Sequence, residues 1–169
     1  MSNPAEKISL RPYQPADAGP ISRIYAHYVQ TSAVTFDLEA PGETQMAQKL
    51  DALQQTGHPL IVASGPRGVL GYAYASTYRT RPAYRFTCEN AIYIAPDACG
   101  QGLGSLLMEK LLHQARVFGF NQMIAIITGD AQGSIALHKK FGFQVLGEFP
   151  ELGFKFNKWH SIVHMQLKL

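Results

Sequence analysis

Three glycines alternate with other residues in a short stretch that follows a strand-like run and directly precedes a helix-like run. Glycine lets the backbone approach a ligand closely, and the N–H groups of the first helical turn have no partner inside the helix. Such a loop is typical of an anion site made from backbone groups, and a pyrophosphate is the anion we expect. The residues of this glycine loop are Gly100, Gln101, Gly102, Leu103, Gly104 and Ser105.

Two other nucleotide-binding loops fit these residues less well. A P-loop ends in Gly-Lys-Ser or Gly-Lys-Thr, whereas Ser105 follows Gly104 directly, so the lysine is missing. A dinucleotide fingerprint would use Gly100, Gly102 and Ser105, but it belongs to an early βαβ unit with an acidic residue about 20 positions later. Asp130 is too distant for that role. A nicotinamide-dependent oxidoreductase is therefore the weakest of the functions that we consider.

Glu89 lies upstream of the glycine loop, inside the strand-like run at 85–94. A carboxylate in a cleft can take a proton from an amine, and burial would raise its pKa toward a useful range. The opposite interpretation is a solvated carboxylate, because Glu89 and Asn90 point to opposite sides of a strand and one of them would face solvent. The spacing of the residues alone leaves both interpretations open.

Arginines and a tyrosine gather just before this strand, where Arg79, Arg81, Tyr84 and Arg85 follow one another closely. A planar guanidinium binds a carboxylate or a phosphinate through two parallel hydrogen bonds, so the cluster is a candidate clamp for an acidic substrate. The alternative is a solvated basic loop, and Pro82 works against an extended segment with all its arginines on one side. We predict that Arg79, Arg81 and Tyr84 contact the substrate.

The composition describes an ordinary globular protein. Its 169 residues are 46% hydrophobic and 16% charged, which predicts one domain that spans 1–169. Fifteen basic and twelve acidic residues give a net charge of +3, too small to indicate nucleic-acid binding.

No apolar run approaches ~18 residues, so we expect no membrane span, and the polar residues 1–6 lack the apolar core of a signal peptide. Cys88 and Cys99 form neither a disulfide framework nor a metal-ligand pattern, so we expect a reduced, cytoplasmic protein without a metal site.

The elements that would position these residues follow a simple order along the chain. Strand-like runs flank the turn at 65–68, and after the glycine loop helical and strand-like periods alternate. Hairpins followed by a β-α-β-α-β succession predict an α/β protein with a mixed sheet and helices on its faces. The expected strands are 8–10, 60–64, 69–77, 85–94, 122–128, 143–149 and 162–169, and the expected helices begin at Pro15, after Gly42, at the glycine loop and at 133.

The segment 93–104 resembles the acetyl-CoA motif of the GNAT acetyltransferase superfamily, in which R/Q-x-x-G-x-G/A follows a splayed strand and binds the CoA pyrophosphate. The segment 134–143 is similar to the superfamily's closing helix and to the Gly-Phe pair that enters the next strand. Within the superfamily, the resemblance narrows to the phosphinothricin N-acetyltransferases and to relatives that act on methionine sulfoximine and sulfone. The residues that carry it are 24–29, 35–36, 78–85, 89, 153–156 and 159.

This resemblance implies an acetyl-CoA-dependent N-acetyltransferase with a GNAT-like fold, in which a central mixed sheet has helices on both faces and splayed strands form the acetyl-CoA cleft. Acetyl would pass directly to the α-amine of a small amino-acid-like acceptor in a ternary complex, with Glu89 removing the amine proton directly or through a water. The cofactor would lie along Ile92, Tyr93 and Ile94 and on the glycine loop. Ser134 is a further candidate contact for the cofactor.

The resemblance also implies roles for residues outside the cofactor motif. His138 stands where many superfamily members place a proton donor for the departing CoA thiolate, although a partly exposed helix histidine is the plainer interpretation. Phe36 lies where relatives build the wall of the acceptor pocket. A loop that corresponds to 153–156 with Trp159 covers the acceptor in relatives, sometimes from a neighbouring subunit, and plain packing is the equal alternative. Relatives are commonly dimers, so a homodimer is expected.

Two residues depart from the family pattern. Cys99 stands where the motif usually has Arg or Gln, and Ala131 stands where relatives usually carry an Asn that reaches CoA. Each loss removes a hydrogen bond worth roughly 0.5–3 kcal/mol, while the backbone groups of the glycine loop remain. We therefore expect weaker CoA binding at most. A non-catalytic acyl-CoA-binding module is the alternative that these departures favour.

Overall fold

Seven strands form one sheet in residues 8–169, the part of the chain that the computed structural model describes. Their order across the sheet is β1-β2-β3-β4-β5-β7-β6, and β4 and β5 are the parallel pair in an otherwise antiparallel arrangement. This is the mixed sheet that the sequence predicts. The strands are β1 (Ser9–Pro12), β2 (Leu60–Gly65), β3 (Gly68–Thr77), β4 (Thr87–Ile94), β5 (Gln122–Thr128), β6 (Gln144–Lys155) and β7 (Lys158–Lys168).

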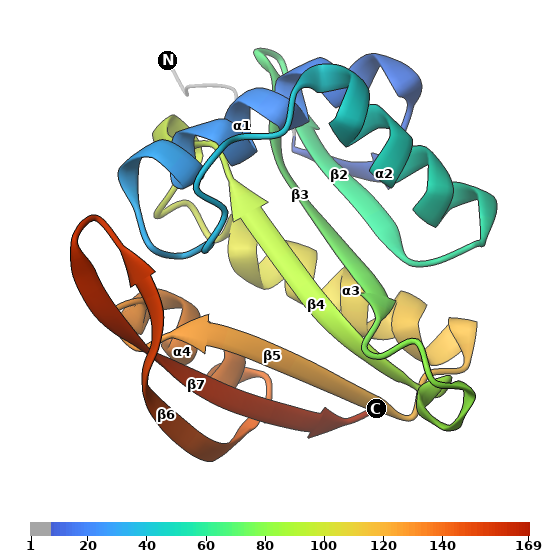
Figure 1. The fold of residues 1–169 in the computed structure, drawn as a ribbon. Coiled ribbons are helices and arrows are strands. Elements are labelled where there is room, and N and C mark those ends of the chain that lie inside the picture. The colour runs from blue at the N-terminus through green and yellow to red at the C-terminus, as the bar shows by residue number, and fades with distance from the viewer. Residues whose placement is uncertain (1–7) are drawn as a thin grey trace, which may run out of the picture.

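Helices cover both faces of the sheet, as expected (Figure 1). α1 (Ala18–Thr31) and α2 (Glu43–Gln55) lie on the face toward the viewer, and α3 (Leu103–Phe118) and α4 (Gln132–Lys140) lie behind it. Pro15 begins a short 3-10 turn, and α1 follows that turn instead of starting at the proline. The segment between α1 and α2 and the β6–β7 hairpin meet at the same end of the molecule as the C-terminal end of β4.

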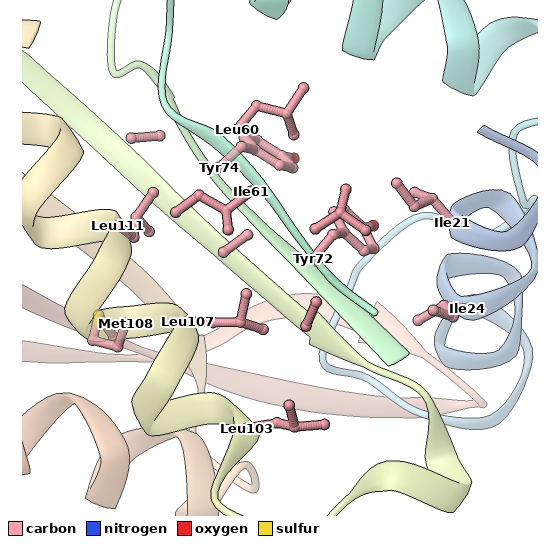
Figure 2. Packing of buried hydrophobic residues seen from close by; sticks show 14 of the residues in the cluster. Ile21, Ile24, Leu60, Ile61, Tyr72, Tyr74, Leu103, Leu107, Met108 and Leu111 are labelled. Carbon is pink, nitrogen blue, oxygen red and sulfur yellow. The ribbon is translucent and has the colours of Figure 1, made fainter. Parts of the chain in front are cut away.

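The core fills the space between the sheet and its helices. Apolar side chains of α3, among them Leu107 and Leu111, point toward one face of the sheet, while Ile21 and Ile24 of α1 point toward the other (Figure 2). β3 is buried over six consecutive residues because helices cover both of its faces, so its side chains do not alternate between core and solvent. The sheet therefore offers a rigid floor to any site at its open end.

The β6–β7 hairpin is longer than the sequence indicates. β6 continues from the expected end at 149 to Lys155, and β7 begins at Lys158 instead of at 162. Phe156 and Asn157 form the two-residue turn with φ of 53° and 54°. Pro150 reads as a strand end, but β6 is an edge strand whose register shifts between 149 and 153, and an edge with a bulge tolerates proline. The predicted loop at 153–156 is therefore the tip of a hairpin.

No helix in residues 8–169 is both long and apolar enough to cross a membrane. The polar segment 1–6, which argued against a signal peptide, lies outside the described residues.

Candidate active site

The sheet opens where β4 and β5 stop pairing. The two strands are hydrogen-bonded only where residues 87–89 lie beside 122–124, and beyond this point they diverge toward the left of Figure 1. The opening is a cleft of about 820 Å³ that is lined both by Glu89 and by residues of the glycine loop. Because the separated strand edges keep main-chain groups that no neighbouring strand uses, an extended ligand can lie along them.

The glycine loop has the open backbone that its sequence predicts. Gly100 and Gly102 have φ of 76° and 81°, in the left-handed region that favours glycine, and a Cβ at either position would have no atom within 4 Å. Gly102 is the N-cap of α3. Across residues 8–169, no acceptor pairs with the backbone N–H groups of Gln101, Gly102, Leu103 and Gly104. These donors are therefore available to an anion.

Ser105 differs from the prediction, because its backbone N–H donates to Gly102 O at 3.1 Å and is not a free donor. Its hydroxyl lines the cleft and accepts a hydrogen bond from Lys140 Nζ at 2.9 Å. Lys140 ends α4 and places a positive charge beside the loop that the sequence analysis did not identify. Gln101 and Leu103 do not line the cleft, and Leu103 is buried in the core.

β4 forms one wall of the cleft, and its alternate side chains face different helices. Tyr93 faces α1, where its ring meets that of Tyr25 edge-on at a centroid distance of 5.1 Å. Tyr28 OH donates to Ile94 O at 2.6 Å and so attaches the end of β4 to α1. Ile92, Tyr93 and Ile94 all line the cleft, and their contact with the pantetheine arm stays a prediction.

Glu89 lies at the point where β4 and β5 separate, and its side chain is half-buried in the cleft. Burial raises the pKa of its carboxyl above the usual 4.5, and the positive charges of Arg79 and Lys49 oppose that rise. Asn90 points to the opposite face, toward α3 and α4, and is also half-buried. The expectation that one of this pair faces solvent is therefore wrong, because helices cover both faces of the sheet.

Lys49 is a cation near Glu89 that the sequence did not indicate. It lies on α2, and its Nζ donates to Tyr74 OH at 2.7 Å and is 4.9 Å from the centroid of the same ring. Tyr74 lines the cleft. The position of Lys49 depends on how α2 packs against the sheet, which no local motif encodes. The contact brings an ammonium group to the side of the cleft where Glu89 lies.

The loop between β3 and β4 holds the predicted substrate-binding residues outside the cleft wall. A 3-10 turn at Pro82–Tyr84 interrupts the extended run, and the Arg85 guanidinium packs over the ring of the next residue. Arg79 is near enough to the Glu89 carboxyl to lower its pKa. Arg81 and Tyr84 are exposed and do not line the cleft. Their contact with a substrate stays a prediction.

His138 is only 5% exposed, so the expectation of a partly exposed helix histidine is wrong. Its Nδ1 is 2.7 Å from Ser134 O, which can only accept, so this nitrogen carries the proton of the neutral ring. Its Nε2 is 3.0 Å from Asn90 Nδ2, which can donate. Burial lowers the pKa of the ring, against the bond to Ser134. A proton-donor role at Nε2 thus needs the charged ring, which burial disfavours.

Ser134 lines the cleft from the first turn of α4. The N-cap of that helix is Ala131, whose side chain makes no capping hydrogen bond. Cys99 is exposed at the cleft, with its Sγ 3.5 Å from Ala95 O and 3.7 Å from Tyr28 OH. Neither Cys99 nor Ala131 supplies the side-chain contact that Arg, Gln or Asn would give at these positions.

Phe36 lines the cleft from the segment between α1 and α2. Its ring centroid is 6.1 Å from that of His160 in β7. In the same segment, Thr35 Oγ1 is 2.8 Å from Tyr25 OH, and Tyr25 OH donates to Asp37 Oδ2 at 2.5 Å. The candidate wall of the acceptor pocket is therefore held between α1 and the β6–β7 hairpin.

Several residues in the cleft or beside it were not predicted from the sequence, for different reasons. Tyr28 belongs to a helical stripe that reads as core, and Lys140 lies in the segment that resembles the family's closing helix, so both had a usable signal. For Asn90, the only signal in the sequence was its position next to Glu89. For Lys49 and Tyr74 the sequence held no signal, because their contact depends on the packing of α2 against β3.

The Acetyltransferase (GNAT) family matches residues 22–143. The chain belongs to this GNAT family. It is 39% identical over 163 residues to the phosphinothricin N-acetyltransferase of Alcaligenes faecalis, an alignment that covers 95% of this chain and 82% of that protein. It is 36% identical to the L-methionine sulfoximine/L-methionine sulfone acetyltransferase of Pseudomonas paraeruginosa, with 95% and 94% covered. A solved structure of a GNAT phosphinothricin acetyltransferase from Sinorhizobium meliloti, in complex with acetyl-CoA, superposes on this chain with a TM-score of 0.93 and 40% sequence identity. The match covers 96% of this chain and 88% of that chain.

Membership of the GNAT family makes this chain an N-acetyltransferase and confirms the fold and the family that the sequence predicts. The Sinorhizobium structure binds acetyl-CoA within the same fold. Identities of 39% and 36% to these two relatives fix the family and leave the acceptor open.

Proposed function

We propose that this N-acetyltransferase moves acetyl from acetyl-CoA to the α-amine of a small amino-acid-like acceptor. The observation that carries the proposal is the half-buried Glu89 at the point where β4 and β5 separate, in the same cleft as the glycine loop. A ligand with its pyrophosphate on the loop and its thioester near Glu89 would extend along β4. The activities of the relatives, on phosphinothricin and on methionine sulfoximine and sulfone, support an amino-acid-like acceptor.

In this proposal, both main-chain and side-chain hydrogen-bond donors bind acetyl-CoA. The free N–H groups of Gly102 and Gly104 would hold the pyrophosphate, with Ser105 Oγ and Lys140 Nζ beside it. The pantetheine arm would pair with the unpaired edge of β4, as an added strand does. Ser134 is placed to contact the cofactor from α4.

The chemistry needs one base and balances without a separate acid. Glu89 takes a proton from the acceptor ammonium, and the neutral nitrogen then attacks the thioester carbon. The tetrahedral intermediate collapses, the carbon–sulfur bond breaks and the CoA thiolate leaves. The nitrogen still carries one excess proton at that stage, and this proton can pass to the thiolate. His138 in its neutral form can therefore stand beside the reaction without donating.

The charges around the cleft fit an acceptor that carries a carboxylate. Arg79 and Lys49 are near enough to the Glu89 carboxyl for their charges to lower its pKa, which supports placing the acceptor on their side of β4. Arg81 and Tyr84 occupy the adjoining loop. We propose that Lys49, Arg79 and Arg81 receive the carboxylate that phosphinothricin and methionine sulfoximine share, and also the acidic phosphinate of phosphinothricin.

Release of free CoA thiol from acetyl-CoA tests the proposal. We expect release when the purified protein is incubated with phosphinothricin, methionine sulfoximine or methionine sulfone, and acetylated acceptor by mass spectrometry. A strong preference for lysine-containing peptides would contradict an amino-acid acceptor. Binding of acetyl-CoA without thiol release for any amine would favour the non-catalytic module that Cys99 and Ala131 suggest.

We also propose that two copies of the chain associate through the β6–β7 hairpin. This hairpin carries a series of large apolar side chains between 44% and 61% exposed, which is unusual for a surface strand pair. Phe154 and Trp159 pack on each other with ring centroids 5.0 Å apart but remain open to solvent. The exposed residues are Val145, Leu146, Phe149, Leu152, Phe154, Phe156 and Trp159.

A further inference from the structure

The inner side of the β6–β7 hairpin packs directly on the segment that carries Phe36. Gly153 of β6 is buried there, and a Cβ added to it would lie 2.1 Å from Phe36 Cζ and 2.2 Å from Phe36 Cε2. Real Cβ atoms essentially never come within 3.0 Å of another heavy atom. The ring therefore occupies the place that any other residue at 153 would need for its side chain.

The requirement for glycine at 153 is one of space. Its φ lies outside the left-handed region, so other residues could adopt the same backbone conformation. Gly147 of the same strand is different, because a Cβ there would meet only the Phe149 ring, at 3.4 Å. A methyl group thus fits at 147, whereas at 153 it would clash with the Phe36 ring unless that ring moved.

A second contact attaches the hairpin to the same segment. Lys155 is only 4% exposed, and its Nζ donates to Thr35 O at 2.9 Å. A buried ammonium is costly unless it is bonded, so the bond to Thr35 O fixes both partners. Thr128 Oγ1 of β5 donates to Ala33 O at 2.8 Å. The backbone that leads into Phe36 is therefore held at two carbonyl groups, those of Ala33 and Thr35.

We propose that Gly153 and Lys155 are positioning residues for Phe36, so that the β6–β7 hairpin of the same chain sets the shape of the acceptor pocket. The inference rests on the proposed function, in which Phe36 is a wall of that pocket. Gly153 leaves room for the ring, and Lys155 holds the backbone that carries it. The glycine loop and β4 are not involved, so the hairpin should act on the acceptor and not on acetyl-CoA.

The test compares Gly153→Ala with Gly147→Ala. Both changes add one methyl group to β6 and remove one glycine, so their effects on the unfolded chain match. For Gly153→Ala we expect the acceptor KM to rise roughly tenfold, with the acetyl-CoA KM unchanged within about twofold. The preference for methionine sulfoximine over a smaller amino acid should also change. Gly147→Ala should leave both KM values as they are.

Removing the Phe36 ring distinguishes an effect on the position of Phe36 from a general disruption of the fold. In a Phe36→Ala background, Gly153→Ala should have no further effect on the acceptor KM, because the methyl group has nothing to displace. Trp159, the single tryptophan, lies on the hairpin, and an unchanged emission spectrum shows that the hairpin is intact. If Gly153→Ala does not fold, Lys155→Met provides the second variant, with the same expected rise in acceptor KM.

Three results would overturn the inference. The first is a folded Gly153→Ala, or Lys155→Met where it replaces that variant, with an unchanged acceptor KM. The second is an equal rise in the KM for acetyl-CoA. The third is an undiminished effect of Gly153→Ala in the Phe36→Ala background. A wild-type protein that acetylates no amino acid would refute the proposed function instead, and the thiol-release assay shows that before any variant is made.

Discussion

Burial and neighbouring positive charges shift the pKa of the Glu89 carboxyl in opposite directions. Burial raises the pKa of its carboxyl, which makes the group a better proton acceptor, and the positive charges of Arg79 and Lys49 limit the rise. For Glu89→Gln we expect kcat to fall by roughly 10²–10⁴-fold, the usual contribution of a general base, with little change in the acetyl-CoA KM. In the wild type, kcat/KM should rise with pH through the pKa of Glu89. Steady-state rates across pH measure both effects, and equal kcat values would remove Glu89 from the mechanism.

The same raised pKa predicts a pH-dependent effect of Glu89 on stability. A carboxyl whose pKa is higher in the folded state than in the unfolded state costs no stability while it is protonated in both states. It destabilises the fold as pH rises from the unfolded-state pKa to the folded-state pKa, and the full effect is present above both. Glu89→Gln should therefore raise Tm relative to the wild type at about pH 8 and not at about pH 4. Thermal melts of both proteins at the two pH values provide the comparison. A difference in Tm that does not depend on pH would show that the carboxyl is not desolvated.

His138 gives the sharpest test of proton delivery to the thiolate. The neutral ring has its proton on Nδ1, bonded to Ser134 O, and burial keeps the pKa low. We therefore expect His138→Gln to reduce kcat by less than about tenfold, a loss of orientation and not of an acid. Asn90→Ala, which removes the group beside Nε2, should have a similar effect. A drop of about 10²-fold or more in His138→Gln that grows as pH falls, where the wild-type ring becomes charged, would restore the donor role.

At the level of single residues, the sequence predicted the features that depend on local sequence patterns. Gly100 and Gly102 have backbone conformations that only glycine adopts easily, and the spacing of the glycines indicated this. The burial of His138 and the contact between Lys49 and Tyr74 depend instead on how helices pack against the sheet. Such contacts join positions 25 or more residues apart, and no local pattern specifies them.

Among the elements, α4 contributes a charge that the glycine loop lacks. Cys99 replaces the usual Arg or Gln of the motif, and Lys140 at the end of α4 reaches Ser105 Oγ beside the same loop. For Lys140→Ala we expect the Kd for acetyl-CoA to rise about 3–10-fold, because a charge-assisted contact with a phosphate is worth more than a neutral one. Calorimetric titration measures it. Lys139→Ala, a change to the exposed preceding residue, is the control.

The result for Lys140 should depend on salt and on the phosphate that is contacted. The loss on Lys140→Ala should shrink at high ionic strength, because salt screens an exposed charge. Titration with dephospho-CoA identifies the phosphate, since the variant and the wild type would then bind equally if the lysine serves the 3′-phosphate. Equal affinities for acetyl-CoA itself at low salt would contradict the contact.

The order of the elements was predictable, and the length of the β6–β7 hairpin was not. Strands and helices as far as 143 were found near their expected places, because hydrophobic periods and glycine or proline punctuation agree there. The expected strand ended at 149, before Pro150, and 153–156 was expected to be a loop. The strand continues to Lys155 because an edge strand tolerates proline and the register shift between 149 and 153, and Gly153 within it packs on the Phe36 ring. The glycine at 153 is therefore explained by a tertiary contact with Phe36 and not by a local conformational preference.

At the scale of the whole molecule, the exposed apolar side chains of the hairpin predict self-association. Leu146 and Leu152 are 61% and 59% exposed, and a stable homodimer would remove such surface from water. We expect light scattering after size exclusion to give about twice the 18.6 kDa of one chain for the wild type. The double variant Leu146→Glu with Leu152→Glu should elute as a single chain. Val117→Glu, at a 76% exposed position on α3, is the matched control and should stay dimeric. A wild type of one-chain mass at micromolar concentration would contradict the dimer, and a dimer that survives both glutamates would move the interface away from the hairpin.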